Sequence, residues 1–395
     1  MRPSARVRQP WRHWDEARLR RNLGVYVHVP FCLSRCPYCD FLTYGAERPP
    51  GLDPSSYIEL LQDEIAKRGA LVREHYAPRG RLVDTVFFGG GTPTFLPHEQ
   101  LASLVSAVFR HFPMAASGVE CTVEANPETL SPGLLHSLVA AGVNRLSIGV
   151  QATQEHHLRW LGRVHRWRAL LPRLRELQAS KLRLSFDLMY GFPGLTPAEV
   201  KDSLGQLMAL GAEHISAYEL TIEQGTPLAL WAHRHGHDMP GSAEVLRQEG
   251  VVSATLRGWG LYRYEVSNYA RVGAECRHNL RYWRGGDYIG LGLGAASRIG
   301  TVVLDNAREI DGYRRAVAMS GSDADPLTGA MSGIGTTAPP ADAFLRLRTR
   351  AGMPAAELRI DPQWIARGWV VIRDGQAMIT PRGLQFADLL AREGG

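Results

Sequence analysis

The chain has 395 residues, of which 45% are hydrophobic and 21% are charged, enough for one large α/β domain with a smaller companion. It contains no run of about 18 apolar residues, which excludes a membrane-spanning helix and leaves at most peripheral membrane contact. The net charge is +6, but residues 1–21 hold seven arginines against two acids, so the rest carries only about +1 and a nucleic-acid partner is not expected.

Residues 1–23 are predicted to form a basic, disordered leader, in preference to a targeting peptide or an acidic-partner contact. This segment lacks the apolar core and cleavage site of a secretory signal. Three of the five cysteines lie within eight residues, which is not the pattern of a disulfide framework. These features together predict a reducing, cytoplasmic location.

Residues 24–230 alternate between short β-branched or aromatic runs and amphipathic segments, which predicts six strand–helix units and a parallel sheet. Both an open doubly wound sheet and a partial barrel satisfy this pattern, and either places catalytic chemistry at the carboxyl ends of the strands. The predicted strands are 25–29, 82–88, 118–124, 145–150, 182–189 and 214–222. The predicted helices are about 56–71, 97–111, 130–141, 154–161, 167–179 and 197–210.

The pattern changes after the sixth unit. Residues 231–320 are predicted to form a core extension with a helix at 241–257, and residues 321–340 are small and polar, which is typical of a linker. Residues 341–395 are predicted to form a small winged-helix-like α+β domain, with a helix at 341–351. Asp374-Gly375 between two apolar runs predicts a β-hairpin in this domain.

Cys32, Cys36 and Cys39 follow the first predicted strand with the spacing Cys-x3-Cys-x2-Cys. Three thiolates on a short loop can bind three corners of a 4Fe–4S cluster, and the missing fourth cysteine leaves one iron open to an exchangeable ligand. Structural zinc usually needs four ligands, and no second cysteine pair is present. A redox Cys-x2-Cys would leave Cys32 unexplained. The isolated Cys121 and Cys276 are expected to be buried apolar residues.

The cysteine loop resembles that of radical S-adenosylmethionine (SAM) enzymes, and Cys39-Asp40-Phe41 is similar to the HemW subgroup of the oxygen-independent coproporphyrinogen oxidase family. The likeness is continuous over about 24–300 and resumes weakly at 341–395. It implies a radical SAM partial (β/α)6 barrel with a small winged-helix-like domain. Further matching motifs are FFGGGTPT (87–94), EANPE (124–128), RLSIGVQ (145–151), LGRVH (161–165), FDLMYGFPG (186–194), YELTIEQGTPL (218–228), YEVSNYA (264–270) and HNLRYW (278–283).

The resemblance implies a SAM site and assigns no catalytic residue. Glycines 89–91 end the second strand, where backbone N–H groups could approach the methionine end of SAM. Asp187 or Glu124 suits ribose hydroxyls or the methionine ammonium, and Arg163 suits its carboxylate. The implied SAM contacts are Tyr26, Tyr38, Gly90, Gly91, Thr92, Glu124, Gln151, Arg163 and Asp187, with Thr221 and Ala296 from less distinctive sequence.

Two functions follow from the resemblance: a heme chaperone that delivers heme to acceptor proteins, and an oxidase that decarboxylates coproporphyrinogen III. A radical SAM reaction on another tetrapyrrole is a third reading. Phe41, where the oxidases carry a fourth cysteine, and the HNxxYW motif favour the chaperone. The motif implies that His278 ligates heme iron and that Tyr282 and Trp283 contact the macrocycle.

The expected partners are heme, heme-acceptor proteins and a reducing electron donor, with the chain a monomer or dimer. Arg277, directly before the HNxxYW motif, and Arg281, within it, are further candidates to meet the propionates of heme. The family's usual Gly-Pro-Gly-Ala-His reads Gly292-Leu293-Gly294-Ala295-Ala296 in this chain, so a proline and a histidine are absent.

Overall fold

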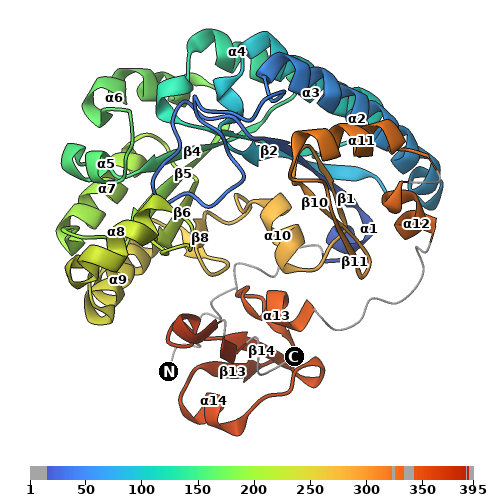
Figure 1. The fold of residues 1–395 in the computed structure, drawn as a ribbon. Coiled ribbons are helices and arrows are strands. Elements are labelled where there is room, and N and C mark those ends of the chain that lie inside the picture. The colour runs from blue at the N-terminus through green and yellow to red at the C-terminus, as the bar shows by residue number, and fades with distance from the viewer. Residues whose placement is uncertain (1–15, 323–324, 333–341, 388, 391–395) are drawn as a thin grey trace.

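A computed structural model describes residues 16–322, 325–332, 342–387 and 389–390. Its core is a curved sheet with helices along the convex face (Figure 1). The six predicted strands are all present and pair in parallel in chain order. They are β1 (Leu23–Val29), β2 (Val83–Gly90), β3 (Glu120–Ala125), β4 (Arg145–Gln151), β5 (Arg183–Tyr190) and β6 (His214–Glu219).

Five further strands extend the sheet on both sides, in the order β11-β10-β9-β1-β2-β3-β4-β5-β6-β8-β7. β9 pairs in parallel with β1, whereas β10, β11, β8 and β7 pair antiparallel. The sheet therefore keeps two edges, as a partial barrel does, and the predicted radical SAM α/β fold is confirmed. The added strands are β7 (Tyr262–Arg263), β8 (Asn268–Ala270), β9 (Tyr288–Leu291), β10 (Ala296–Ile299) and β11 (Val302–Asp305).

The helices between the strands bury one face against the sheet. In α3, Leu101, Leu104, Val105 and Val108 are all buried, which is the i, i+3, i+4, i+7 pattern of an amphipathic helix. Side-chain caps begin several helices, including a complete capping box at Thr196. The helices are α2 (Pro54–His75), α3 (His98–His111), α4 (Pro132–Ala141), α5 (Glu155–Trp160), α6 (Trp167–Glu176) and α7 (Pro197–Ala209).

The core extension places α10 (Arg277–Trp283) on the concave side of the sheet (Figure 1). Arg281 fixes it there: this fully buried guanidinium pairs with Asp84 and donates to the carbonyl oxygens of Leu19 and Asn22 at 2.7 and 2.6 Å. These contacts hold α10 against the amino-terminal ends of β1 and β2, on the concave side of the sheet. The remaining helices are α8 (Pro227–His235), α9 (Ser242–Gly258) and α11 (Ile310–Met319).

Two predicted unstructured segments are partly ordered. Residues 1–15 of the expected leader lie outside the described residues, but α1 (Glu16–Arg21) packs on the core, where Arg18 pairs with Asp84 at 2.9 Å. Within the expected linker 321–340, residues 326–332 form α12, and Leu327 and Met331 are buried against the main core. This helix was not predicted from the sequence because the apolar i, i+4 pair lies in a segment of mostly small residues. Residues 333–341 of the expected linker and its boundary lie outside the described residues.

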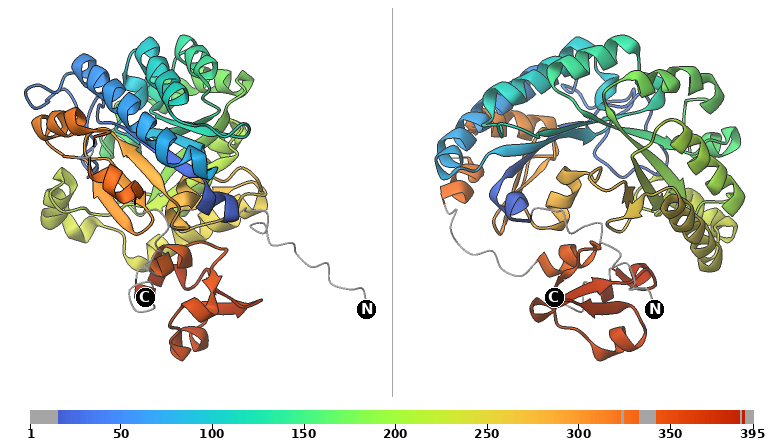
Figure 2. Two further views of the ribbon diagram at one scale, coloured as in Figure 1. Left: turned by 90° about the vertical axis from the view of Figure 1, so that its right-hand side faces the viewer. Right: turned by 180° about the vertical axis from the view of Figure 1, so that it is seen from behind.

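The small terminal domain has its own core and a three-stranded sheet (Figure 2). The predicted hairpin is present: Asp374 and Gly375 have φ of 50° and 74°, as its tight turn requires. The predicted helix at 341–351 ends at Leu347. The elements are α13 (Asp342–Leu347), β12 (Met353–Pro354), α14 (Pro362–Ala366), β13 (Val370–Arg373) and β14 (Gln376–Ile379).

Arg284, at the end of α10, joins the terminal domain to the core by donating to Thr349 and Gly352 at 3.0 and 2.6 Å. None of the helices in the described ranges is long and apolar enough to cross a bilayer.

Candidate functional site

The cysteine loop leaves the carboxyl end of β1 and borders a cavity of about 140 Å³. Its backbone is fixed by hydrogen bonds, from Cys32 N–H to Tyr44 O at 2.9 Å and from Cys39 N–H to Cys36 O at 3.1 Å. Most of the predicted SAM and cluster residues meet around this cavity, at the carboxyl ends of β1 to β5. They are Cys32, Cys36, Tyr38, Cys39, Gly90, Gly91, Thr92, Glu124, Gln151, Arg163 and Asp187.

The three thiols fit an iron–sulfur cluster better than a single ion. In the described ranges, the three sulfur atoms do not all lie within 4.8 Å of one another. Three thiolates bound to one tetrahedral zinc, each at about 2.3 Å, would have sulfur atoms about 3.8 Å apart. Arg163 Nη1 donates to Cys36 Sγ at 3.4 Å, and Thr92 Oγ1 donates to Cys32 Sγ at 3.5 Å. Such donors stabilise sulfur ligands of a cluster.

Burial raises the pKa of Cys32 to about 11, although the hydrogen bond from Thr92 acts to lower it. Burial also raises the pKa of Cys39. Without a metal, the Cys32 and Cys39 thiols are therefore protonated at neutral pH, and binding a metal has to release these two protons.

The glycines that end β2 serve the packing of the cysteine loop. Gly90 has φ of 101°, and a Cβ there would lie 2.2 Å from the His28 ring. The N–H groups expected to meet a ligand already have partners: Gly90 donates to Glu124 Oε2 at 3.1 Å, and Gly91 donates to Val29 O at 2.9 Å. Thr92 N–H likewise donates to Phe31 O at 2.7 Å. In this structure the three N–H groups are therefore already satisfied within the chain, and a contact of these residues with SAM stays a prediction.

Glu124 and Asp187 place two buried carboxyl groups beside the cysteine loop. Burial, followed by the nearby Asp187, raises the pKa of Glu124 to about 8. Burial also raises the pKa of Asp187, against a 3.3 Å hydrogen bond from Ser147 Oγ. Carboxyl groups whose charged form is disfavoured by burial suit a ligand bearing an ammonium group, which stabilises that charge, or hydroxyls.

Asn126 is a site residue that sequence reasoning missed. Its Nδ2 donates to Thr92 Oγ1 at 2.8 Å, and its Oδ1 accepts from Arg163 Nη2 at 2.6 Å. Arg163 also donates to Gly149 O at 2.8 Å, so its guanidinium is a brace between the β4 end and the cysteine loop. The signal was available, because Asn126 lies directly after a strand within the EANPE motif.

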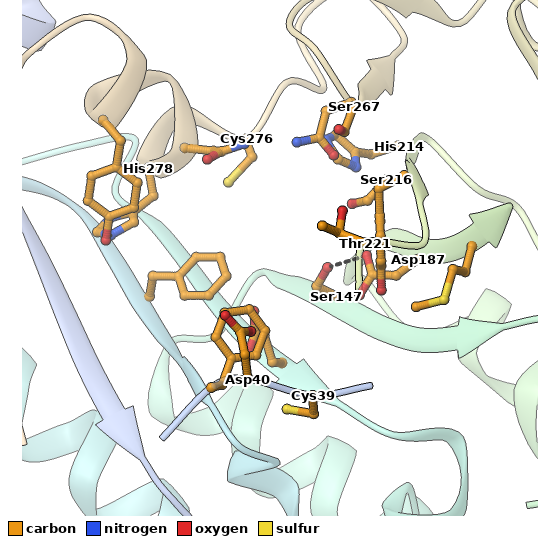
Figure 3. Close-up of a pocket in the computed structure, with 18 of the residues that line it drawn as sticks. Cys39, Asp40, Ser147, Asp187, His214, Ser216, Thr221, Ser267, Cys276 and His278 are labelled. Atoms are coloured by element: carbon orange, nitrogen blue, oxygen red, sulfur yellow. Dashed lines mark hydrogen bonds between the residues drawn. The ribbon is translucent and has the colours of Figure 1, made fainter. Parts of the chain in front are cut away.

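A larger cavity of about 670 Å³ adjoins the smaller one and extends from Cys39 and Asp40 to His278 on α10 (Figure 3). The two cavities share Tyr38, Cys39, Phe41, Glu124, Ser147, Asp187 and Tyr218 as lining residues. Of the predicted residues, Tyr26, Thr221, His278 and Tyr282 line the larger cavity only. Phe41, at its border, is 65% exposed.

His278 is buried in the wall of this cavity, and both ring nitrogens have partners. Nδ1 lies 3.0 Å from Thr85 Oγ1, and Nε2 lies 2.8 Å from the Tyr282 hydroxyl. Its ring stacks on Phe87 with centroids 5.3 Å apart. Burial, then the charge of Arg281, lowers the pKa of His278 well below its usual value, so the imidazole is neutral.

Four predicted residues lie away from both cavities. Trp283 packs under the Arg348 guanidinium, 5.4 Å from the ring centroid, and Ala296 pairs with Asp305 in the β10–β11 ladder. Arg281 is used up in fixing α10, and Arg277 donates to Asp84 O and Gly118 O. In this structure the two arginines are therefore engaged elsewhere and do not line the larger cavity, and their contact with heme propionates stays a prediction.

Comparison with known proteins gives a consistent result. A family model described as the Radical SAM superfamily matches residues 26–207. The protein named heme chaperone HemW from Mycobacterium tuberculosis is 36% identical over 378 residues, covering 93% of this chain and 94% of that relative. Its Bacillus subtilis namesake is 35% identical, covering 75% and 76%. The solved structure of the coproporphyrinogen III oxidase HemN from Escherichia coli, 23% identical, has a similar fold, with a TM-score of 0.68 over 95% of this chain and 91% of that one.

Proposed function

Because this chain belongs to the HemW family of the radical SAM superfamily, we propose that it is a heme chaperone of the cytoplasm. It binds a 4Fe–4S cluster through Cys32, Cys36 and Cys39, holds SAM beside the cluster, and takes up heme for transfer to acceptor proteins. The observation that carries this proposal is the large cavity adjoining the cysteine loop. At about 670 Å³, it falls within the range of about 300–1,000 Å³ typical of small-molecule sites.

The lining of the cavity supports a large, flat, mostly apolar guest. Phe41, Phe87, Met189, Leu220 and Tyr282 contribute apolar surface, and aromatic rings pack well against a macrocycle. The neutral imidazole of His278 lies in the same wall. An uncharged imidazole is the form that ligates heme iron.

Ligation by His278 would require one of its hydrogen bonds to open. The Tyr282 hydroxyl lies 2.8 Å from Nε2, and Tyr282 lines the cavity in which heme would bind. Thr85, the partner of Nδ1, lies on β2 and does not line the cavity. Heme would therefore displace the Tyr282 hydroxyl more easily than Thr85. We therefore assign Nε2 as the iron ligand, with Tyr282 as the residue that releases it.

The SAM site is assigned to the smaller cavity. Glu124 and Asp187 would hold the ammonium or ribose hydroxyls, Gln151 and Asn126 offer amide groups, and Arg163 braces the loop. A bound cluster would supply an electron to the SAM sulfonium, and the residues described here orient the two and exclude water. A reducing electron donor is needed for that step.

The test is an anaerobic reconstitution of the cluster followed by two separate additions. Heme should be taken up stoichiometrically, with a Soret shift that persists through gel filtration. Coproporphyrinogen III, with SAM and a reductant, should give no vinyl product by mass spectrometry. Formation of protoporphyrinogen would instead identify an oxidase, and failure to retain heme would refute the chaperone function.

A further inference from the structure

A second group of potential metal-ligating side chains lies outside the two cavities, on α5 and α7. The two helices lie near each other on the outer side of the sheet (Figure 1). His156 and His157 on α5 face Glu199 at the beginning of α7, and one ligand atom from each lies within 4.8 Å of the others. We propose that His156, His157 and Glu199 form a binding site for a divalent transition-metal ion of the zinc class.

The spacing of the ligand atoms matches a single ion. His156 Nε2 lies 3.4 Å from Glu199 Oε1, and His157 Nε2 lies 3.3 Å from Glu199 Oε2. Two ligands about 2.1 Å from a tetrahedral zinc are about 3.4 Å apart. These distances are long for charge-assisted hydrogen bonds, which are about 2.7–2.9 Å.

A buried nitrogen without a well-formed hydrogen bond provides a second observation. The His157 side chain is only 3% exposed, and its Nε2 makes no hydrogen bond of acceptable geometry within the described part of the chain, although Glu199 Oε2 lies 3.3 Å away. A buried polar atom of this kind costs about 1–3 kcal/mol when it is left unsatisfied. A metal ion would satisfy it.

The support of the Glu199 carboxylate also suits a metal site. Thr196 N–H and Oγ1 donate to Glu199 Oε2 at 3.0 and 2.8 Å, which orients the carboxylate as outer-shell partners orient metal ligands.

The position of the site suggests what the ion does. α5 follows β4, whose last residue Gln151 lines the smaller cavity, and α7 follows β5, which carries Asp187. An ion held by both helices would clamp the connections that leave these neighbouring strands. Because His156 is 59% exposed, an ion can enter from solvent, and a fourth position remains for water.

The experiment measures zinc binding to the full chain with its cluster assembled, so that iron occupies the cysteine loop. After equilibration with Zn²⁺ and dialysis, the chain should retain about one zinc, and its thermal unfolding midpoint should rise with Zn²⁺ concentration. His156→Ala and Glu199→Gln should weaken zinc binding at least tenfold and abolish the rise. Co²⁺ should give tetrahedral ligand-field absorption in the unsubstituted chain only.

His98→Ala is the matched control, because His98 forms an exposed pair with Glu99 at 3.1 Å and has no third potential ligand among the residues that the structure describes. Circular dichroism establishes that each variant is folded. Zinc retention by His156→Ala and Glu199→Gln at the original affinity, or no retained zinc in the unsubstituted chain, would overturn the proposal. Neither result depends on heme or SAM binding.

Discussion

Replacement of His278 separates its role in the fold from its proposed role in heme binding. In His278→Ala, the Tyr282 hydroxyl loses its 2.8 Å partner inside the protein, and Thr85 retains only its 3.3 Å contact with Arg281 Nε. One buried unsatisfied group costs about 1–3 kcal/mol, and the space left by the ring beside Phe87 adds a cavity term. We expect His278→Ala to lower the free energy of unfolding by about 3 kcal/mol.

His278→Gln is the informative companion, because its amide can still reach hydrogen-bond partners while being a poor iron ligand. We expect it to lose about 1 kcal/mol of stability and nearly all heme uptake. Urea unfolding followed by circular dichroism gives the stability, and heme titration followed at the Soret band gives the affinity.

Tyr282→Phe serves as the control, since it removes the hydroxyl and frees His278 Nε2 without removing the imidazole. It should keep or strengthen heme binding. Unchanged heme affinity in a folded His278→Gln variant would refute iron ligation by His278, and an unchanged urea midpoint in His278→Ala would refute the energetic reasoning.

Three further predictions concern the cysteine loop and its surroundings. Cys36→Ala should lose most of the cluster iron measured after anaerobic reconstitution, whereas Cys121→Ala, at a buried site in β3, should keep it. Folding raises the pKa of Glu124 from 4.5 to about 8, so between these pH values the folded chain holds a proton that the unfolded chain releases. The free energy of unfolding should therefore fall as the pH rises from about 4.5 to 8. Glu124→Gln should flatten this decline, measured by urea unfolding. Gly90→Ala should cost about 3 kcal/mol or more in thermal unfolding, because of its positive φ and the clash with His28.

The controls for these predictions follow from the same structure. Gly133→Ala, on α4 with open space around the added Cβ, should leave the unfolding midpoint nearly unchanged or raise it. An iron content in Cys36→Ala equal to that of the unsubstituted chain would contradict the cluster assignment. A Glu124→Gln variant with the same pH profile as the parent would show that folding does not raise the pKa of Glu124.

Regular local patterns made most of the fold predictable. All six core strands lie within a few residues of their predicted ranges, because alternation and β-branched residues identify buried parallel strands. The hairpin at Asp374-Gly375 was found from two residues whose backbone preference is local. In contrast, α12 depends on Leu327 and Met331 meeting a distant surface, and short-range composition carries no information about that contact.

The site residues divide in the same way. The spacing of the three cysteines identified the cysteine loop, and the position of Glu124 and Asp187 toward the carboxyl ends of their strands identified the carboxyl groups. The carboxyl ends of parallel strands lie together, so it was predictable that these residues meet. The neighbours of the HNxxYW motif were not. Arg281 and Trp283 lie on the same short helix as His278, yet one is buried under the sheet and the other contacts the terminal domain. Only the packing of α10 distinguishes these faces.

The common lining of the two cavities has a thermodynamic consequence. Tyr38, Glu124, Asp187 and Tyr218 would touch an occupant of either chamber, so the free energy of filling one depends on whether the other is full. This dependence is reciprocal: if the first occupant changes the affinity for the second by some factor, the second changes the affinity for the first by the same factor. If heme fills the larger cavity and SAM the smaller one, as proposed, the presence of SAM would change the affinity for heme without the movement of a domain.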